Sequence, residues 1–152
     1  MLTTLYDGNT GAPLCFDDAM VIAAIQMPSA TTCLLFSNGP RFVVAGGCEV
    51  IMGGFSPGVR EALTDLSGVN KGVPFYLAPN AIGQIMPVMD GQNVLFGKTE
   101  IILKTGAKIG IPSGPSDVIH AITGERVQEP SRLKLAGLDE VESPTPDSNG
   151  KV

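Results

Sequence analysis

The chain has 152 residues, a formal net charge of −5, and 43% apolar but only 16% charged residues, a length that allows one ordinary domain or two very small ones. Residues 1–72 carry three basic and six acidic side chains, residues 73–124 three of each, and residues 125–152 four and six, so no segment has the basic excess that DNA or RNA binding requires. Aromatic residues make up only 5% of the chain and Trp is absent, which argues against a carbohydrate or single-stranded nucleic-acid groove.

The first 44 residues favour β-strands separated by tight turns. Residues 2–6 and 13–16 predict a hairpin, and residues 31–44 predict a second one with Asn38-Gly39 at its turn. Residues 19–27 would make only a short helix, and their β-branched side chains also fit a buried strand. We favour the strand.

The first helix signal comes after the glycine-rich segment 45–54, whose glycines weaken any helix there. Ser56 can cap a helix and Pro57 suits its first position, so we predict a helix over residues 57–67. Residues 68–74 have linker composition. A boundary between two units is therefore expected there.

The second half repeats the β pattern and ends in a helix. A strand is predicted over residues 74–82, an extra loop over 89–97, and a hairpin over 98–111. Pro115 opens a predicted helix over residues 115–123, which Gly124 ends.

Two segments of the chain are similar at a constant offset. Residues 31–44 align with residues 98–111, including two apolar runs and a turn in the same order. The repeat predicts a mainly β fold with two pseudo-repeated small β-barrel or half-barrel units, each with a short helix. The expected domains are residues 1–68 and 69–124, followed by an extended polar tail over 125–152.

The tail has rising charge and proline content and no periodicity. Its aliphatic anchors are Leu133, Leu135 and Leu138. We interpret it as a segment that clamps a neighbouring subunit, with these three leucines as contact residues.

Few residues suggest chemistry. His120 stands alone in a predicted helix, and Gly106, Gly110 and Gly114 suit turn and cap roles because no P-loop or dinucleotide motif surrounds them. Asp17-Asp18 is interpreted as a solvated turn, since adjacent side chains on an extended chain point to opposite faces. We therefore expect no catalytic residue, no cofactor, no metal and no enzymatic activity.

Three lysines, Lys98, Lys104 and Lys108, bracket the second central hairpin. They could form a small basic interaction patch. Alternatively, they protect an exposed edge strand from unwanted pairing, which is the interpretation that we favour.

The three cysteines, Cys15, Cys33 and Cys48, have neither the number nor the spacing of a disulfide framework or a zinc motif. We expect mostly small buried residues in a reducing compartment, with a pairing between two of them left open. Neither a secretion signal nor a membrane span is expected.

Each repeat resembles the small bacterial FlbD/SwrD-like family associated with flagella, whose pattern is a strand, a polar step, an apolar strand, a hairpin and a short helix. The resemblance implies a small non-enzymatic β module and supplies no catalytic residues. The matching positions are Phe16-Asp17-Asp18, Ile25, 34–36, Asn38-Gly39 and Val43-Val44 in the first copy, and 76–80, Ile82, Ile85, 101–103, Gly106, 109–111 and Val118-Ile119 in the second.

The low charge, the abundant glycine and the lack of chemistry favour a structural role. The expected function is a phage virion component, such as a head decoration or connector subunit, that binds its own copies or a larger lattice. The expected partners are protein subunits, with no nucleic acid, membrane or small-molecule substrate, and the expected location is the virion, assembled in the host cytoplasm. The alternative is a regulatory adaptor in the bacterial cytoplasm that binds a single protein partner.

Overall fold

A computed structural model describes residues 1–127 of the chain. Most of the predicted tail, with Leu133, Leu135 and Leu138, lies outside the described residues. In chain order the elements are β1 (Leu2–Tyr6), β2 (Pro13–Asp17), η1 (Asp18–Met20), β3 (Val21–Met27), β4 (Thr31–Phe36), β5 (Arg41–Ala45), α1 (Cys48–Gly53), α2 (Pro57–Ala62), β6 (Thr64–Asp65), η2 (Ser67–Asn70), β7 (Phe75–Leu77), η3 (Pro79–Ala81), β8 (Ile82–Asp90), β9 (Asn93–Leu103), β10 (Lys108–Ile111) and α3 (Pro115–Thr123).

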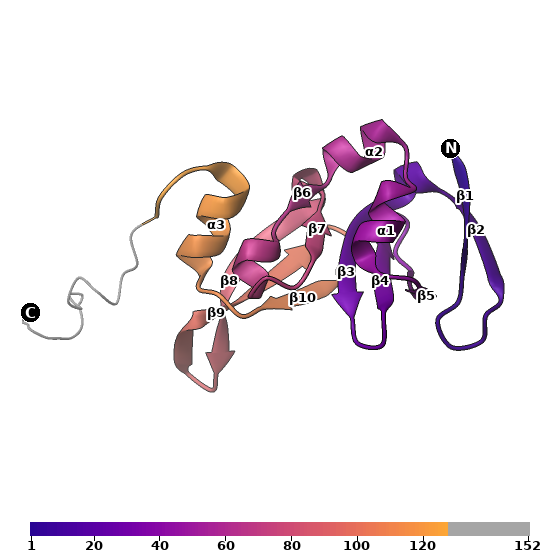
Figure 1. Ribbon diagram of the computed structural model, residues 1–152. Coiled ribbons are helices and arrows are strands. Elements are labelled where there is room, and N and C mark those ends of the chain that lie inside the picture. The colour runs from indigo at the N-terminus through magenta and orange to yellow at the C-terminus, as the bar shows by residue number, and fades with distance from the viewer. Residues whose placement is uncertain (128–152) are drawn as a thin grey trace, which may run out of the picture.

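The strands form three sheets that follow one another along the molecule (Figure 1). Their strand orders are β1-β2, β5-β4-β3-β7-β6 and β10-β9-β8, and the described strand pairs are antiparallel. The prediction of a mainly β protein is confirmed. Of the expected barrel or half-barrel units, the closed barrel is wrong, because none of these sheets closes on itself within residues 1–127.

The same order of elements occurs twice: β1 to β5 and α1 correspond to β6 to β10 and α3. The pairing registers agree between the two copies. Thr3 lies opposite Phe16 as Thr64 lies opposite Leu77, both 61 residues later. The strand pairs β3-β4 and β8-β9 even share a register shift at the same place, between Val21 and Ala23 in one and between Ile82 and Gln84 in the other. The structure thus extends the sequence repeat to nearly all of residues 2–123.

A buried threonine marks the centre of each copy. Thr32 and Thr99 are both 0% exposed. The hydroxyl of Thr32 donates to the carbonyl oxygen of Gly46 at 2.8 Å, and that of Thr99 donates to the carbonyl oxygen of Ser113 at 2.6 Å. Each bond ties a central strand to the segment just before the helix of its copy.

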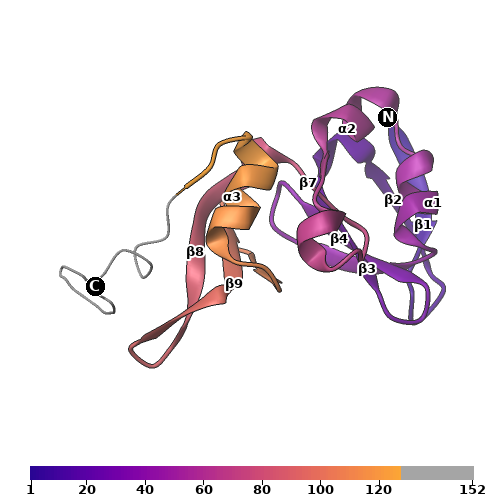
Figure 2. The same ribbon diagram turned by 60° about the vertical axis from the view of Figure 1, so that its left-hand side comes forward.

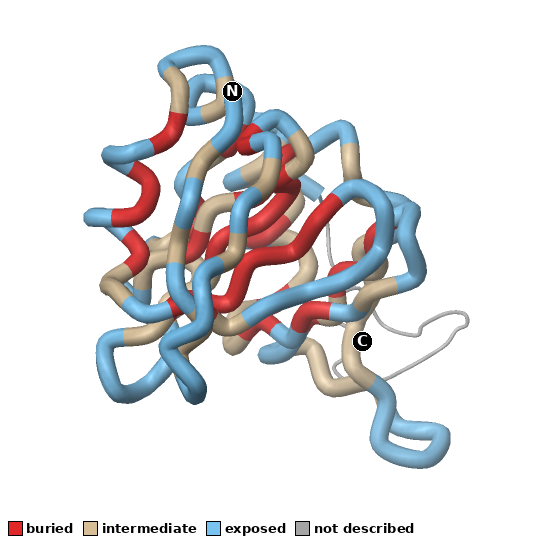
Figure 3. Tube along the Cα trace, turned by 90° about the vertical axis from the view of Figure 1, so that its right-hand side faces the viewer, coloured by how far each residue is buried: buried red, intermediate tan, exposed pale blue. Residues whose placement is uncertain are grey.

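The core lies mainly between the sheets and the helices. Figure 3 shows the buried stretches running through the centre of the trace, with exposed turns around them. Phe16 packs edge-to-face on Phe36 and Phe55, with ring centroids 5.0 and 6.4 Å apart. The largest fully buried side chains are Phe55, Phe75, Leu34, Leu66, Leu77, Ile101, Leu103, Val44 and Val118.

Two helix predictions for the first copy need correction. The glycine-rich segment does form a helix, α1, because Cys48, Ile51 and Met52 are buried and this packing outweighs the low helix propensity of glycine. Helix α2 ends at Ala62 and not at residue 67, since Thr64 pairs with Leu77 in the sheet.

In the second copy, the predicted helix over residues 115–123 is confirmed, and Gly124 ends it with a φ of 79°. The loop predicted over residues 89–97 is wrong. β8 and β9 continue as a hairpin to a turn at Gly91-Gln92, and this extension protrudes from the body of the molecule (Figure 2). Alternation within this segment is weak, which is why its strand character was missed.

Asp17-Asp18 is not a solvated turn throughout, because Asp18 is 0% exposed. Its Oδ2 accepts hydrogen bonds from the Ser56 amide at 2.8 Å and from the Ser56 hydroxyl at 2.5 Å, and its Oδ1 lies 3.2 Å from the Met1 amino group. Burial opposes the charged form, but these hydrogen bonds outweigh it, so the pKa of Asp18 lies below its ordinary value. Asp18 thereby fixes η1 against the start of α2.

We predict that Thr99→Val lowers the free energy of unfolding by about 1–2 kcal/mol, because it leaves the Ser113 carbonyl without its donor at nearly unchanged volume. Thr32→Val should have a similar effect on the first copy. Urea unfolding followed by circular dichroism measures both. Thr4→Val, at an exposed position of β1, is the matched control, and an equal loss there would contradict this account.

We predict that Asp18→Asn removes about 1–3 kcal/mol of stability at neutral pH. Because the folded pKa is lowered, the stabilisation by Asp18 is present above its unfolded pKa and is lost as the pH falls through the folded pKa. Stability curves of the variant should therefore fall less steeply in acid than those of the wild type. Asp90→Asn, at the exposed hairpin tip, should leave the wild-type slope in place.

Candidate functional site

Three turns lie together where the five-stranded and three-stranded sheets meet. They are residues 37–41, which join β4 to the first residue of β5, η3 before β8, and residues 104–108, which join β9 to the first residue of β10. We call these residues the turn surface. A hollow joins the three turns and is lined by Ile22, Ser37, Asn80, Ala81, Lys104 and Thr105.

The local sequence explains why both hairpin turns are tight. Gly39 has a φ of 113° and Gly106 a φ of 94°, a region that side chains with a Cβ rarely adopt. The amide of Gly39 donates to the Phe36 carbonyl at 3.0 Å, and the amide of Gly106 donates to the Leu103 carbonyl at 2.9 Å. The two turns are therefore the same structure in the two copies of the repeat.

Backbone hydrogen bonds hold the turns in their relative positions. The amide of Lys104 donates to the Ala81 carbonyl at 2.8 Å, which ties the β9-β10 turn to η3. The amide of Ser37 donates to the Met20 carbonyl at 2.8 Å, which ties the β4-β5 turn to the start of β3. The surface is thus presented by rigid elements and not by a long loop.

The turn surface is basic although the chain as a whole is acidic. Arg41, Lys104 and Lys108 are exposed, and the turn surface contains no Asp or Glu. The chain overall has 15 acidic and 10 basic residues. The three turns therefore carry three basic residues and no acidic one, and Lys104 is the basic residue that lines the hollow.

The same surface offers unused hydrogen-bonding groups. Asn38 and Asn80 are exposed, and within residues 1–127 their side chains have no hydrogen-bond partner. Each amide provides both a donor and an acceptor in fixed relative geometry. The arrangement suits recognition of an anionic ligand that also presents donors and acceptors.

The three lysines predicted as an interaction patch lie at two different places in the structure. Lys104 and Lys108 belong to the turn surface, and Lys108 also lies on β10, an edge strand where protection from pairing applies as well. Lys98 lies in the stretch of β9 that the shift in register with β8 leaves unpaired, next to a different hollow with Val88 and Thr99. The patch of three lysines is not one site.

Arg41, Asn38 and Asn80 were missed by the sequence analysis. A signal for Arg41 was present, since it aligns with Lys108 in the repeat. Asn80 had no such signal. It joins the surface because the Ala81 carbonyl accepts a bond from the β9-β10 turn, a contact between segments far apart in sequence.

The histidine and the cysteines lie elsewhere. His120 is half-buried in α3, and its Nδ1 has no hydrogen-bond partner among residues 1–127. All three cysteines are free thiols: Cys33 and Cys48 are buried, as expected, whereas Cys15 is exposed. Burial, together with nearby Glu49, raises the pKa of Cys48 to about 11, so this thiol is unreactive at neutral pH.

In residues 1–127, no group of three His, Cys, Asp or Glu side chains is placed to hold a metal ion. No helix in that part of the chain is both long and apolar enough to cross a membrane.

The comparisons with known proteins give a likeness in structure alone. No family model and no curated protein matches the chain. A solved structure, the LytTr DNA-binding domain of a Bacillus cereus response regulator, is similar with a TM-score of 0.51 at 9% identity. The match covers 82% of this chain and 97% of that one. At this identity it establishes the fold only.

This likeness overturns several expectations from the sequence. The FlbD/SwrD-like resemblance is wrong, because the solved structure that is similar over 82% of this chain is a LytTr domain. The same finding overturns the expected functions. These were a phage virion component, such as a head decoration or connector subunit, and the adaptor that binds a single protein partner. The exclusion of nucleic acid as a partner is also overturned, because the fold is one that a DNA-binding domain uses. The expectation of no nucleic acid was based on charge counts along the sequence. Such counts do not show which charged residues lie on one surface.

Proposed function

We propose that this chain is a DNA-binding regulatory module that contacts double-stranded DNA through the turn surface. Two independent observations support the proposal. One is the fold shared with a DNA-binding domain. The other is that the three turns of the turn surface carry Arg41, Lys104 and Lys108 and no acidic residue, in a chain that is otherwise acidic.

The basic side chains provide the affinity. Lysine and arginine neutralise phosphates and release condensed counterions, with a slope of log K against log salt of about −0.9 per phosphate. The three basic residues of the turn surface therefore set an upper limit of about −3 for this slope. Acidic residues elsewhere repel DNA, so that the turn surface is the face that DNA approaches.

The two asparagines provide the sequence preference. An asparagine amide can form a bidentate pair with the N6 and N7 groups of adenine in the major groove. Asn38 and Asn80 are exposed and free for such contacts. Because they come from different copies of the repeat, they would reach different base pairs.

The module acts by binding and not by catalysis in this proposal. Binding occludes or marks a DNA site, and its natural location is the bacterial cytoplasm, where DNA is accessible. An assay for DNA cleavage alongside the binding measurements tests this part of the proposal.

We predict that the wild-type chain enriches specific duplexes from a random-sequence double-stranded pool. Lys104→Gln should weaken binding to the enriched duplex and reduce the salt slope by about 1, because one phosphate contact is lost. Fluorescence anisotropy over a salt series measures both. Lys71→Gln is the matched control, since Lys71 is exposed and lies outside the turn surface.

Failure to enrich any duplex would refute the proposal. Equal weakening by Lys71→Gln would show that binding is a general charge effect and would refute the assignment of the turn surface. Circular dichroism of each variant verifies that the fold is retained.

We predict that Asn80→Ala relaxes the base preference at one position of the enriched sequence. The expected loss is about 1–3 kcal/mol on the preferred duplex, or about 5- to 150-fold in Kd, if the amide makes a bidentate contact. The salt slope should not change, since no charge is removed. A uniform loss on all duplexes would contradict a base-reading role for Asn80.

A further inference from the structure

The two copies of the repeat are joined by a pairing between strands. β3 of the first copy pairs with β7 of the second, with Ala24 opposite Tyr76 at the centre. The amide of Gln26 donates to the Pro74 carbonyl at 2.9 Å, and the amide of Ala78 donates to the Ile22 carbonyl at 2.8 Å. This junction builds the five-stranded sheet out of strands from both copies.

The counterparts of these two strands are both edges. β8 corresponds to β3, and β2 corresponds to β7. Within residues 1–127, β8 pairs only with β9, and β2 pairs only with β1. The chain therefore has two free strand edges. They belong to β8 and β2, the counterparts of the two strands, β3 and β7, that pair at the internal junction.

The two free edges have the same local design as the paired ones. Pro13 begins β2 and the equivalent Pro74 directly precedes β7, and Gly11 and Gly72 come two residues earlier with φ angles of 74° and 78°. In the first copy, the amide of Asp18 donates to the Met1 carbonyl, so the amides of Cys15 and Asp17 point to the outer side of β2. By the same alternation, the backbone of Ile85 points outward from β8, as that of Ala24 points toward β7.

We propose that β8 of one chain pairs with β2 of a second copy, head to tail, in the register of the internal β3-β7 junction. The equivalence places Ile85 opposite Cys15 of a second copy, with Gln84 opposite Phe16 and Met86 opposite Leu14. This mode of association adds a strand to an exposed sheet edge.

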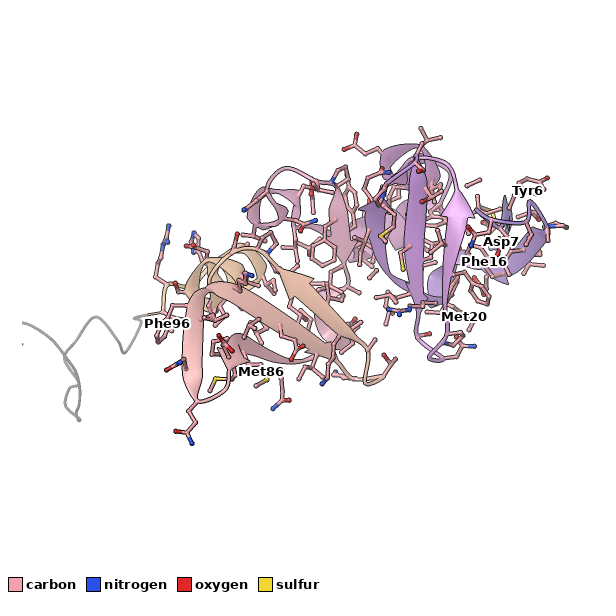
Figure 4. All side chains as sticks on the ribbon, turned by 90° about the horizontal axis from the view of Figure 1, so that it is seen from below. Tyr6, Asp7, Phe16, Met20, Met86 and Phe96 are labelled. Carbon is pink, nitrogen blue, oxygen red and sulfur yellow. The ribbon has the colours of Figure 1, made fainter. Side chains whose placement is uncertain are left out.

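One molecule cannot satisfy both edges by itself. Phe16 lies in the right-hand part of the molecule and Met86 in the left-hand part, well apart from each other (Figure 4). The apolar side chains Leu14, Phe16, Ile85 and Met86 are only half-buried, whereas Phe75 and Leu77 at the internal junction are fully buried. A second copy would supply the cover that these side chains lack.

The pairing between copies is weaker than the internal junction. Pro87 stands where Gln26 stands in the first copy, and proline has no amide hydrogen to donate to Pro13 of a second copy. One ladder bond is therefore lost, and association depends on protein concentration. A head-to-tail contact of this kind uses two different surfaces, so dimers can extend to longer oligomers.

A disulfide trap tests the register. Cys15 is exposed and free, and a central hydrogen-bonded pair of an antiparallel ladder has Cα atoms about 5.5 Å apart, within the range that a disulfide spans. Mild oxidation of full-length Ile85→Cys, without DNA, should give a ladder of dimers, trimers and longer species on a non-reducing gel. Gln92→Cys, exposed at the hairpin tip, is the matched control and should not exceed the wild type.

Adding Cys15→Ser to Ile85→Cys should abolish the ladder. If that double variant still forms dimers, β8 pairs with β8 and the proposal is wrong. If Gln92→Cys crosslinks as well as Ile85→Cys, the contact is random collision and the proposal is again wrong.

Sedimentation velocity without crosslinking provides a second measurement. Cys15→Pro removes the outward amide of β2 but no hydrogen bond to β1, so it should shift the protein to monomer, whereas Cys15→Ser should associate as the wild type does. A wild-type chain that stays monomeric at every concentration would overturn the proposal. DNA binding is measured separately and does not decide this result.

Discussion

The pairing of β3 with β7 is the interaction on which the rest of the structure depends. Without it, β6 and β7 would form an isolated two-stranded pair, which is marginal in water. With it, five strands form one sheet across both copies, and Phe75 and Leu77 become fully buried. The backbone hydrogen bonds at its two ends fix the angle between the copies.

This junction also places the turn surface. It positions the strand leading into η3 directly beside β3, while the amide of Lys104 holds η3 against the β9-β10 turn. Ser37 from the first copy and Lys104 and Thr105 from the second thus line one hollow together with Asn80. A duplicated hairpin turn becomes a composite surface only because the copies are joined in this register.

Buried polar contacts recur where elements must be held at one distance. Thr32 and Thr99 tie their strands to the segments before α1 and α3, and Asp18 ties η1 to α2. Each is fully buried and fully hydrogen-bonded, so removing a single partner leaves a buried polar group without water. These contacts specify the arrangement of elements more than they add to its stability, because burial costs each polar group its hydration.

The sequence by itself determined the mainly β class, the repeated hairpin, the helix over residues 115–123 and the glycine turns, because strand alternation, turn residues and caps act over short distances. It also indicated Lys104 and Lys108. Only the tertiary structure decided the remainder: helix α1 in a glycine-rich segment, the burial of Asp18, the exposure of Cys15, and the meeting of Ser37, Asn80 and Lys104. These features depend on contacts between segments far apart in the chain, which neither local propensity nor total charge records.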